Sequence, residues 1–367
     1  MTYGNLNVDT VTTSTAGGIL GAGNASIMKN RIINGAMVID QRNAGASVTA
    51  STTSAFTYTL DRWSYYATAA SKFTVQQNAG SVTPPVGFTK YLGVTSSSAY
   101  SVSSTDILTI NQVIEGFNIA DLNWGTANAK TVTLSFQVYS SLTGTFGGAL
   151  SNSASTQYYP FSYTVSSANT WTTVSVTIAG STTGTWASDN SAGLYIYFGL
   201  GVGSSKSGTA GSWGSTAVYS ATGATSVVGT SGATFYITGV QLEVGSSATG
   251  FEYRQYGTEL ALCQRYFVLT NPSNGSRCGG MWGTTYTSTA GHLTGLVPVP
   301  MRTAPSVTAG GTNNTFYMSN VNATSAGTFG TFSTSTTIVD AEVSSMTASS
   351  TGQPIQYNGQ LSISAEL

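Results

Sequence analysis

Apolar and polar residues alternate along several segments of this chain, and this period of two constrains the fold more than any other feature. The segment 132–138 carries Val, Leu or Phe at even positions and Thr, Ser or Gln at odd ones. The segments 174–178 and 194–200 place apolar residues in the same alternation. Such a pattern buries one face of a β-strand against a core. Gly-, Asn- and Ser-rich stretches separate the runs without an intervening helical pattern, so we predict an antiparallel β-sandwich of the jelly-roll type.

One strand changes phase along its length. Apolar residues from Phe235 to Ile237 lie at odd positions, whereas those from Val240 to Val244 lie at even positions. A single extra residue at Gly239 accounts for the shift, because glycine tolerates the backbone of a bulge. We therefore predict a β-bulge there.

Charged residues make up only 7% of the chain, against roughly a quarter in ordinary soluble domains. Ser and Thr must supply much of the surface polarity, and they favour strands and turns over helix interiors. The 12 basic and 13 acidic residues are too few to protect many strand edges. We therefore expect an oligomer whose contacts cover those edges. A net charge of −1 attracts neither nucleic acid nor anionic lipid, so neither is an expected partner.

The chain divides by composition into four parts. Its 367 residues exceed what one hydrophobic core usually serves. We expect an extended N-terminal arm at 1–28, a jelly-roll β-sandwich at 29–256, a short linking helix at 257–269 and a second, smaller β-sandwich domain at 270–367. The arm is polar and Gly-rich, so we expect it to gain order only against a partner. The apolar residues that would attach it are Leu6, Val8, Val11, Ile19 and Leu20.

The linking helix supplies candidates for an oligomer interface. Thr258 is a candidate N-cap, and Leu260, Cys263 and Phe267 follow at helical spacing. We expect these three side chains to face a subunit axis or the seam between the domains. With Cys278, the chain has two cysteines, which are too few for a disulfide scaffold and fit no zinc motif. We expect free thiols.

No residue pattern marks a catalytic site. The chain has one histidine, His292, on which any Ser-His-Asp or Cys-His arrangement would depend, and it has no G-x-S-x-G motif. Its acidic residues are isolated in sequence, so no carboxylate pair of a glycoside hydrolase is marked. A calcium ion would suit a jelly roll, but no calcium-binding loop motif is present. We expect no enzyme, no cofactor and no metal.

The first residues show no signal-peptide pattern, and no apolar run approaches the length of a membrane span. We expect assembly in a cytoplasm and no membrane insertion.

The aromatic residues point to carbohydrate binding. The chain contains 20 Tyr, 14 Phe and 6 Trp. Sugar rings stack their C–H faces on flat side chains, while Tyr, Asn and Gln hydrogen-bond the hydroxyls. We interpret Trp63 and Trp171 as core residues because they lead into strands. The candidates in loop-like contexts, for each of which packing or a subunit contact is the alternative, are Trp124, Tyr158, Tyr159, Trp186 and Trp213.

Several segments resemble parts of bacteriophage and prophage tail-fibre proteins. The segments 61–63, 129–136, 169–178 and 235–245 resemble strands of carbohydrate-binding-module-like jelly rolls. A more distinctive junction joins Phe251-Glu252-Tyr253-Arg254 to the run 259–267. It is similar to a junction in tail-fibre proteins, where a C-terminal domain with a Met-Arg-x-x-Pro element and a final Ala-Glu-Leu follows. The matching residues here are 301–305 and 365–367.

The resemblance implies a homotrimeric virion fibre. The arm would attach to other phage tail or baseplate proteins, and the β domains would contact host-cell polysaccharide. It implies a location in the virion after assembly in the host cytoplasm. A head or collar fibre, or a decoration protein without a receptor role, is the alternative, followed by a polysaccharide depolymerase. No residue matches a known sugar contact of the family.

Overall fold

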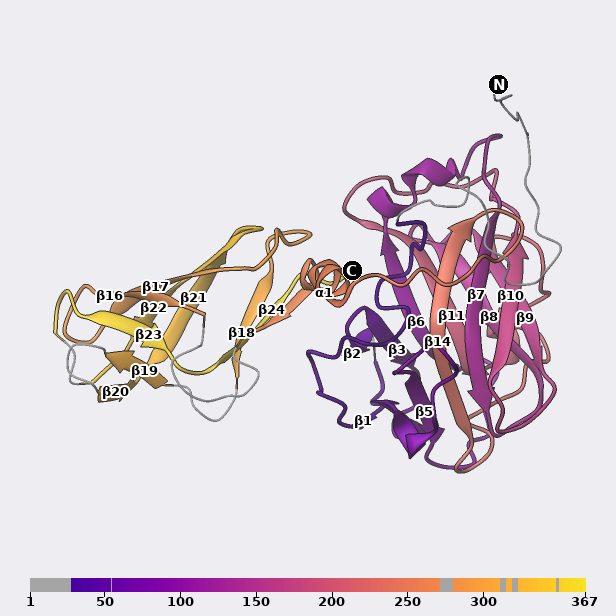
Figure 1. The fold of residues 1–367 in the computed structure, drawn as a ribbon, viewed down its shortest axis with the longest axis horizontal. Helices are drawn as coiled ribbons and strands as arrows, with labels where there is room; N and C mark the ends of the chain where they lie inside the picture. Colours follow the sequence, from indigo (N-terminus) through magenta and orange to yellow (C-terminus); the bar gives the residue numbers. More distant parts are fainter. Residues whose placement is uncertain (1–27, 54, 271–279, 311–314, 319–322, 348–349) are drawn as a thin grey trace, which may run out of the picture.

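Two six-stranded antiparallel sheets, A and B, pack face to face in the larger part of the molecule (Figure 1). The computed structural model describes residues 28–270 except 54, and then 280–310, 315–318, 323–347 and 350–367. Sheet A consists, in spatial order, of β1 (Val48–Thr49), β4 (Phe73–Gln77), β5 (Leu92–Ser96), β14 (Thr234–Val244), β7 (Val132–Ser140) and β10 (Thr172–Ile178). Sheet B consists of β2 (Thr57–Leu60), β3 (Trp63–Ala67), β6 (Ile107–Glu115), β11 (Ala192–Val202), β8 (Gly144–Asn152) and β9 (Tyr158–Val165). The predicted all-β sandwich is confirmed.

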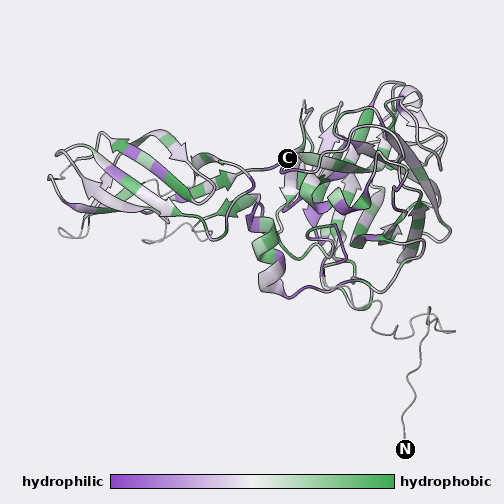
Figure 2. Ribbon diagram, turned by 90° about the horizontal axis from the view of Figure 1, so that it is seen from above, coloured by the Kyte–Doolittle hydropathy of each residue, from purple (hydrophilic) through white to green (hydrophobic). Residues whose placement is uncertain are grey.

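The alternation of apolar residues builds the core between the sheets. The even-numbered residues of β7 from Val132 to Val138 and of β11 from Leu194 to Leu200 face the core, and large rings fill the space between the two sheets. Figure 2 shows the hydrophobic stretches on the strands of this part. The rings of this core that are exposed by no more than 1% are those of Trp63, Tyr65, Phe73, Phe136, Phe146, Phe161, Phe198 and Phe235. Trp63 is thus a core residue, as predicted.

The predicted bulge in β14 is confirmed. Its pairing with β7 shifts register between Thr238 and Gln241. Gly239 has a φ of 61°, a left-handed backbone that most side chains disfavour. The bulge turns the apolar residues after Gly239 back toward the core, which is why the sequence changes parity there.

A segment between β11 and β14 folds back over sheet B. It contains the short parallel pair β12 (Ser207–Gly208) and β13 (Ser220–Ala221). The connections of this first sandwich also include four 3-10 turns, η2 (Ala79–Ser81), η3 (Gly116–Asn118), η4 (Ala120–Leu122) and η5 (Ser204–Lys206).

The helix is shorter than predicted. Helix α1 spans Tyr256–Gln264 and follows Gln255 as its N-cap, so Thr258 lies inside it. Residues Phe267–Leu269 form strand β15, which pairs with β24 (Gln360–Ser364). The spacing of Leu260, Cys263 and Phe267 fits a helix, but Phe267 pairs with Ser364, 97 residues further along the chain, and local spacing does not reveal such a contact.

The C-terminal part is a second, smaller sandwich (Figure 1). Its three-stranded sheet D has the order β15, β24 and β18 (Ser306–Gly310). Its seven-stranded sheet C consists of β20 (Ala323–Ala326), β19 (Thr315–Met318), β23 (Pro354–Tyr357), β16 (Trp282–Thr285), β17 (Gly291–Leu296), β22 (Ile338–Ser344) and β21 (Thr328–Thr334). The two sheets enclose a separate core that includes Leu293, Phe316 and Tyr357. In the described parts of the chain, no helix has the length and apolarity that a membrane crossing needs.

Candidate functional site

Aromatic side chains gather on the outer face of sheet B. Because Leu194, Ile196 and Phe198 of β11 face the core, the intervening Tyr195 and Tyr197 point to the other side. Their rings lie 6.1 Å apart and almost parallel, at 19°.

Glycines let the overlying segment reach this face. A Cβ on Gly147 would lie 2.5 Å from Oγ of Ser220, and one on Gly199 would lie 2.7 Å from the same atom. Any larger residue at either position would therefore displace the segment around β13. The close approach places the ring of Tyr219 5.1 Å from that of Tyr197, nearly perpendicular at 89°.

A pocket of about 150 Å³ opens between these groups. Its wall includes the ring of Phe56, which lies 6.2 Å from the ring of Tyr66 and 6.3 Å from that of Tyr197. None of the described side chains that line it is charged, and they are Phe56, Tyr66, Ile107, Thr109, Tyr197 and Tyr219. The pocket thus offers flat apolar surfaces together with tyrosine and threonine hydroxyls.

Burial raises the pKa of two of these tyrosines. Desolvation raises the pKa of Tyr219 to about 12, and the neighbouring Tyr158 adds to the rise. Desolvation also raises the pKa of Tyr197 far above its ordinary value. Desolvation thus opposes ionisation of Tyr197 and Tyr219, and a protonated phenol both donates and accepts hydrogen bonds. We did not predict this pocket from the sequence. Tyr195 and Tyr197, which alternate with the core residues of β11, were a usable signal for an aromatic outer face.

The structure brings four of the five predicted sugar-binding aromatics into one cluster. Trp124 packs edge-on against Trp186 at 4.7 Å and against Trp213 at 5.4 Å. Tyr159 lies 5.2 Å from Trp213. Trp124 is 6% exposed, and its indole N–H donates to the carbonyl of Lys130 at 2.7 Å. The indole N–H groups of Trp186 and Trp213 also donate to backbone carbonyls.

This cluster packs against the first core, with Trp186 and Trp213 half-buried at its margin. Its ring faces and indole donors are already in contact with the protein. Tyr158, the fifth candidate, is 3% exposed and lies 6.0 Å from Tyr219 beside the pocket of sheet B. Trp171, expected in the core, is instead half-buried on the outer face of sheet A, where its ring lies 5.6 Å from that of Tyr91.

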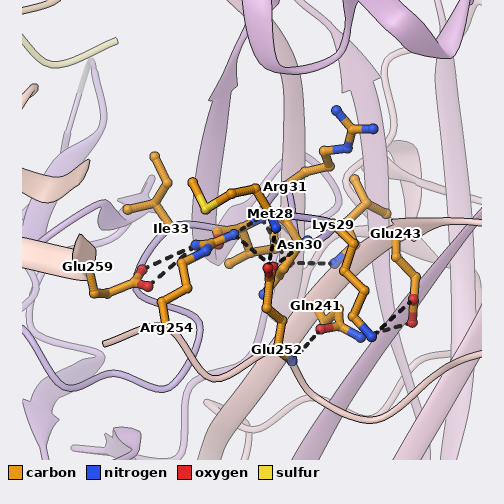
Figure 3. A network of polar contacts seen from close by, with 12 residues as sticks. Met28, Lys29, Asn30, Arg31, Ile33, Gln241, Glu243, Glu252, Arg254 and Glu259 are labelled. Carbon is orange, nitrogen blue, oxygen red and sulfur yellow. Dashed lines mark hydrogen bonds and ion pairs between the residues drawn. The ribbon is translucent and has the colours of Figure 1, made fainter. Parts of the chain in front are cut away.

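A network of charges fixes the segment that enters the first sandwich. The carboxylate of Glu252 accepts hydrogen bonds from the backbone N–H of Asn30 at 2.8 Å and from that of Met28. Figure 3 shows Arg254 between two carboxylates, with N–O distances of 3.3 Å to Glu252 and 3.4 Å to Glu259. The chain has few charged residues, and Glu252, Arg254 and Glu259 are used here to hold the backbone of the entering segment in place.

A second group of charges joins the two sandwiches. Arg265 donates two hydrogen bonds to Glu115, at 3.0 and 2.5 Å, and the Tyr266 hydroxyl donates to the same carboxylate at 2.5 Å. Arg302 donates from its backbone N–H to the carbonyl of Arg265 at 2.9 Å and from its guanidinium to that of Glu366 at 2.9 Å. The segments that carry the tail-fibre resemblance, far apart in sequence, therefore meet at this junction.

The predicted oligomer-interface residues lie at the seam between the sandwiches. Cys263 is fully buried and Phe267 is 5% exposed, both against residues of this chain. The guanidinium of Arg42 lies 3.7 Å from the centre of the Phe267 ring. Leu260 is half-buried and packs on the cluster that contains Ile39 and Cys263. Of these three side chains, only that of Leu260 is exposed enough to contact another subunit.

Most described acidic side chains have structural partners. Besides the pairs above, Lys29 lies 3.8 Å from Glu243 and Arg31 lies 2.7 Å from Asp121. His292 is exposed on β17. Within the described ranges, no three His, Cys, Asp or Glu side chains are grouped to hold a metal ion. Cys263 has a free thiol.

Two of the predictions fall outside the described residues. They concern Cys278 and the five attachment candidates of the arm, Leu6, Val8, Val11, Ile19 and Leu20.

No family model and no curated protein matches the chain. Among solved structures, it is similar to a family 4 carbohydrate-binding module at 15% identity, with 50% of this chain and 87% of that one covered and a TM-score of 0.26. It is similar to the family 11 carbohydrate-binding module of Clostridium thermocellum at 11% identity, with 56% and 98% covered and a TM-score of 0.27. The enzymatically active domain of bacteriophage CBA120 tailspike protein 4 is 10% identical, with 59% and 22% covered and a TM-score of 0.29.

Proposed function

We propose that this chain is a structural fibre subunit of a phage virion and binds uncharged glycan on the outer face of sheet B. The observation that carries the binding proposal is the pocket bounded by Phe56, Tyr66, Tyr197 and Tyr219. Its rings offer stacking surfaces for the C–H faces of a sugar, and its neutral hydroxyls can bond sugar hydroxyls. Because the described lining carries no charge, an uncharged saccharide fits it better than an acidic one.

The proposed role is adhesion without catalysis. The carboxylates of Glu115, Glu252, Glu259 and Glu366 are held by arginines at the junction or along the entering segment, where they stabilise the fold. A glycoside hydrolase would instead need two carboxylates placed on either side of a bound sugar. The pocket on sheet B is lined by no described carboxylate.

The fibre role rests on the tail-fibre resemblance of the junction residues. We propose a homotrimer whose residues 1–28 attach to tail or baseplate proteins and whose β domains face the host surface. Light scattering of the purified chain tests the trimer, and a monomeric mass would contradict it. Electron microscopy of intact particles tests the position, since a head or collar location would overturn the tail assignment.

The binding proposal is tested by retention of the full chain in native gels that contain soluble neutral polysaccharides, such as dextran and mixed-linkage β-glucan. Replacing Tyr219 or Phe56 with alanine should raise the dissociation constant roughly tenfold, about 1.4 kcal/mol. Tyr286→Ala, which removes a half-exposed ring from the second sandwich, is the matched control. Unchanged retention of Y219A and F56A, or retention of the wild type by none of the glycans, would contradict the proposal.

A further inference from the structure

The outer face of sheet C carries an exposed tryptophan inside a row of polar side chains. Trp282 of β16 is 55% exposed. It pairs directly with Gln356 of β23 on one side and Thr294 of β17 on the other, and Thr294 pairs with Asp340 of β22. Directly paired residues of antiparallel strands project to the same face. The row therefore spans three inter-strand spacings, roughly 14 Å.

A second row lies beside the first. Thr284 pairs with His292, and His292 pairs with Glu342. The alternate residues of the same strands, among them Leu293 and Val343, belong to the buried core. Burial of these alternate residues thus determines that Trp282 lies on the outer face of the sheet. The strand pairing places the two polar rows beside its ring.

One polar atom in this face lacks a partner. The carboxylate oxygen Oδ1 of Asp340 is buried and accepts no hydrogen bond from the described residues. A buried carboxylate oxygen without a donor is costly. Rotation of the carboxylate about its Cβ–Cγ bond would present this oxygen to a ligand hydroxyl above the row, and Trp282, two strands away, offers a flat apolar surface on the same face.

A second copy of this chain is the other candidate for this face. Leu296, 71% exposed, and Ile338 form a pair on it and would suit such a contact. However, a two-fold contact between copies would bury Asp340 and Glu342 against their own equivalents. Arg302 is the single Lys or Arg among the described residues from 280 onward, and it is engaged at the junction. The uncompensated carboxylates therefore favour a hydroxyl-rich ligand.

We propose that the face around Trp282 is a second saccharide-binding surface, with Trp282 as the stacking platform and Asp340 as a hydroxyl acceptor. The proposal shares the ligand class of the proposed function. It lies on another sandwich, however, and involves none of the residues of the pocket on sheet B.

The test compares the full chain with Trp282→Ala and Asp340→Asn on a glycan array of neutral, acidic and amino sugars. Every chain in this comparison also carries Tyr219→Ala, which weakens binding at the pocket on sheet B. We expect retention of at least one neutral glycan, weakened roughly tenfold by W282A and several-fold by D340N. Phe117→Ala, which removes an exposed ring of the first sandwich, should change nothing.

The two proposals fail separately. Equal signals for Y219A alone and for Y219A with W282A overturn the second surface, and so does the absence of any signal in the Y219A background. Neither result bears on the pocket of sheet B, which is tested by comparing Y219A and F56A with the wild type in native gels. Sedimentation that depends on concentration and is abolished by W282A, without a glycan effect, would assign this face to contacts between copies and would also overturn the proposal.

Discussion

The guanidinium of Arg62 and the carboxylate of Glu366 form an ion pair between the two sandwiches, although 304 residues separate them in sequence. Arg62 is only 1% exposed, and its guanidinium also lies 3.7 Å from the centre of the Tyr266 ring. Arg42 binds the same carboxylate at 2.6 Å. A chain with 12 basic residues thus places two of them on one acidic side chain at the junction.

Replacing Glu366 with alanine should destabilise the protein by about 3–5 kcal/mol, because it leaves the buried guanidinium of Arg62 without its counter-charge. The free energy of unfolding in urea measures the effect. Asp121→Ala is the control, since Asp121 pairs with Arg31 but is 49% exposed, and its loss should cost at most about 1 kcal/mol. Equal costs would show that the junction pair is no more important than a surface pair.

Replacing Trp124 with alanine should destabilise the first sandwich by about 3–5 kcal/mol, because it empties the centre of a packed aromatic cluster. At a temperature where the variant is folded, its retention on neutral glycan should equal that of the wild type. Loss of glycan binding by a folded W124A protein would instead make this cluster the sugar site, as the sequence suggested.

The bulge in β14 should tolerate no side chain. In Gly239→Ala, the new Cβ would lie 2.5 Å from the ring of Phe88 in a backbone with φ of 61°. Gly232→Ala is the control, because its φ of 73° is similar but nothing lies within 4 Å of the new atom. Backbone strain alone should lower the free energy of unfolding of the control by about 1–2 kcal/mol, and G239A should lower it further. Thermal or urea unfolding that ranks the two equally would contradict this account of the bulge.

Tyr219 should contribute a pH-dependent term to stability. Burial raises its pKa from 10.0 to about 12, so the folded protein keeps a proton that the unfolded chain loses. The contribution is complete below pH 10 and is lost as the pH rises through about 12. Urea unfolding of the wild type should therefore weaken more steeply over this range than that of Tyr219→Phe. Parallel pH profiles would show that Tyr219 is not buried as described.

The alternation of apolar and polar residues in the sequence predicts the β-sandwich fold. It does not predict where the pocket on sheet B lies. Inward residues such as Phe136 and Phe198 follow the period of two, and the shift at Gly239 marks the bulge. The sequence predicts the helix in the right place but too long at its C-terminal end. Phe267 pairs with Ser364 in a β-strand, and local sequence does not show this long-range contact. Local patterns predict strands, and they do not tell which distant strands pair.

The candidate site was missed for the same reason. Trp124, Trp186 and Trp213 stand in loop-like sequence, yet loops far apart in the chain meet and bury one another's rings. Tyr219 reaches sheet B only because Gly147 and Gly199 admit the segment that carries it. That approach depends on three separate parts of the chain, and no single stretch of sequence shows it. The sequence marks the junction between the sandwiches more clearly. The segments 259–267, 301–305 and 365–367, which carry the tail-fibre resemblance, meet there.

The most direct test of the account is a crystal structure of the full chain soaked with a neutral oligosaccharide that retards it in native gels. We predict a sugar ring in the pocket of sheet B, stacked between the rings of Phe56, Tyr197 and Tyr219. A sugar bound at Trp124, Trp186 and Trp213 while the pocket on sheet B stays without one would contradict the central claim.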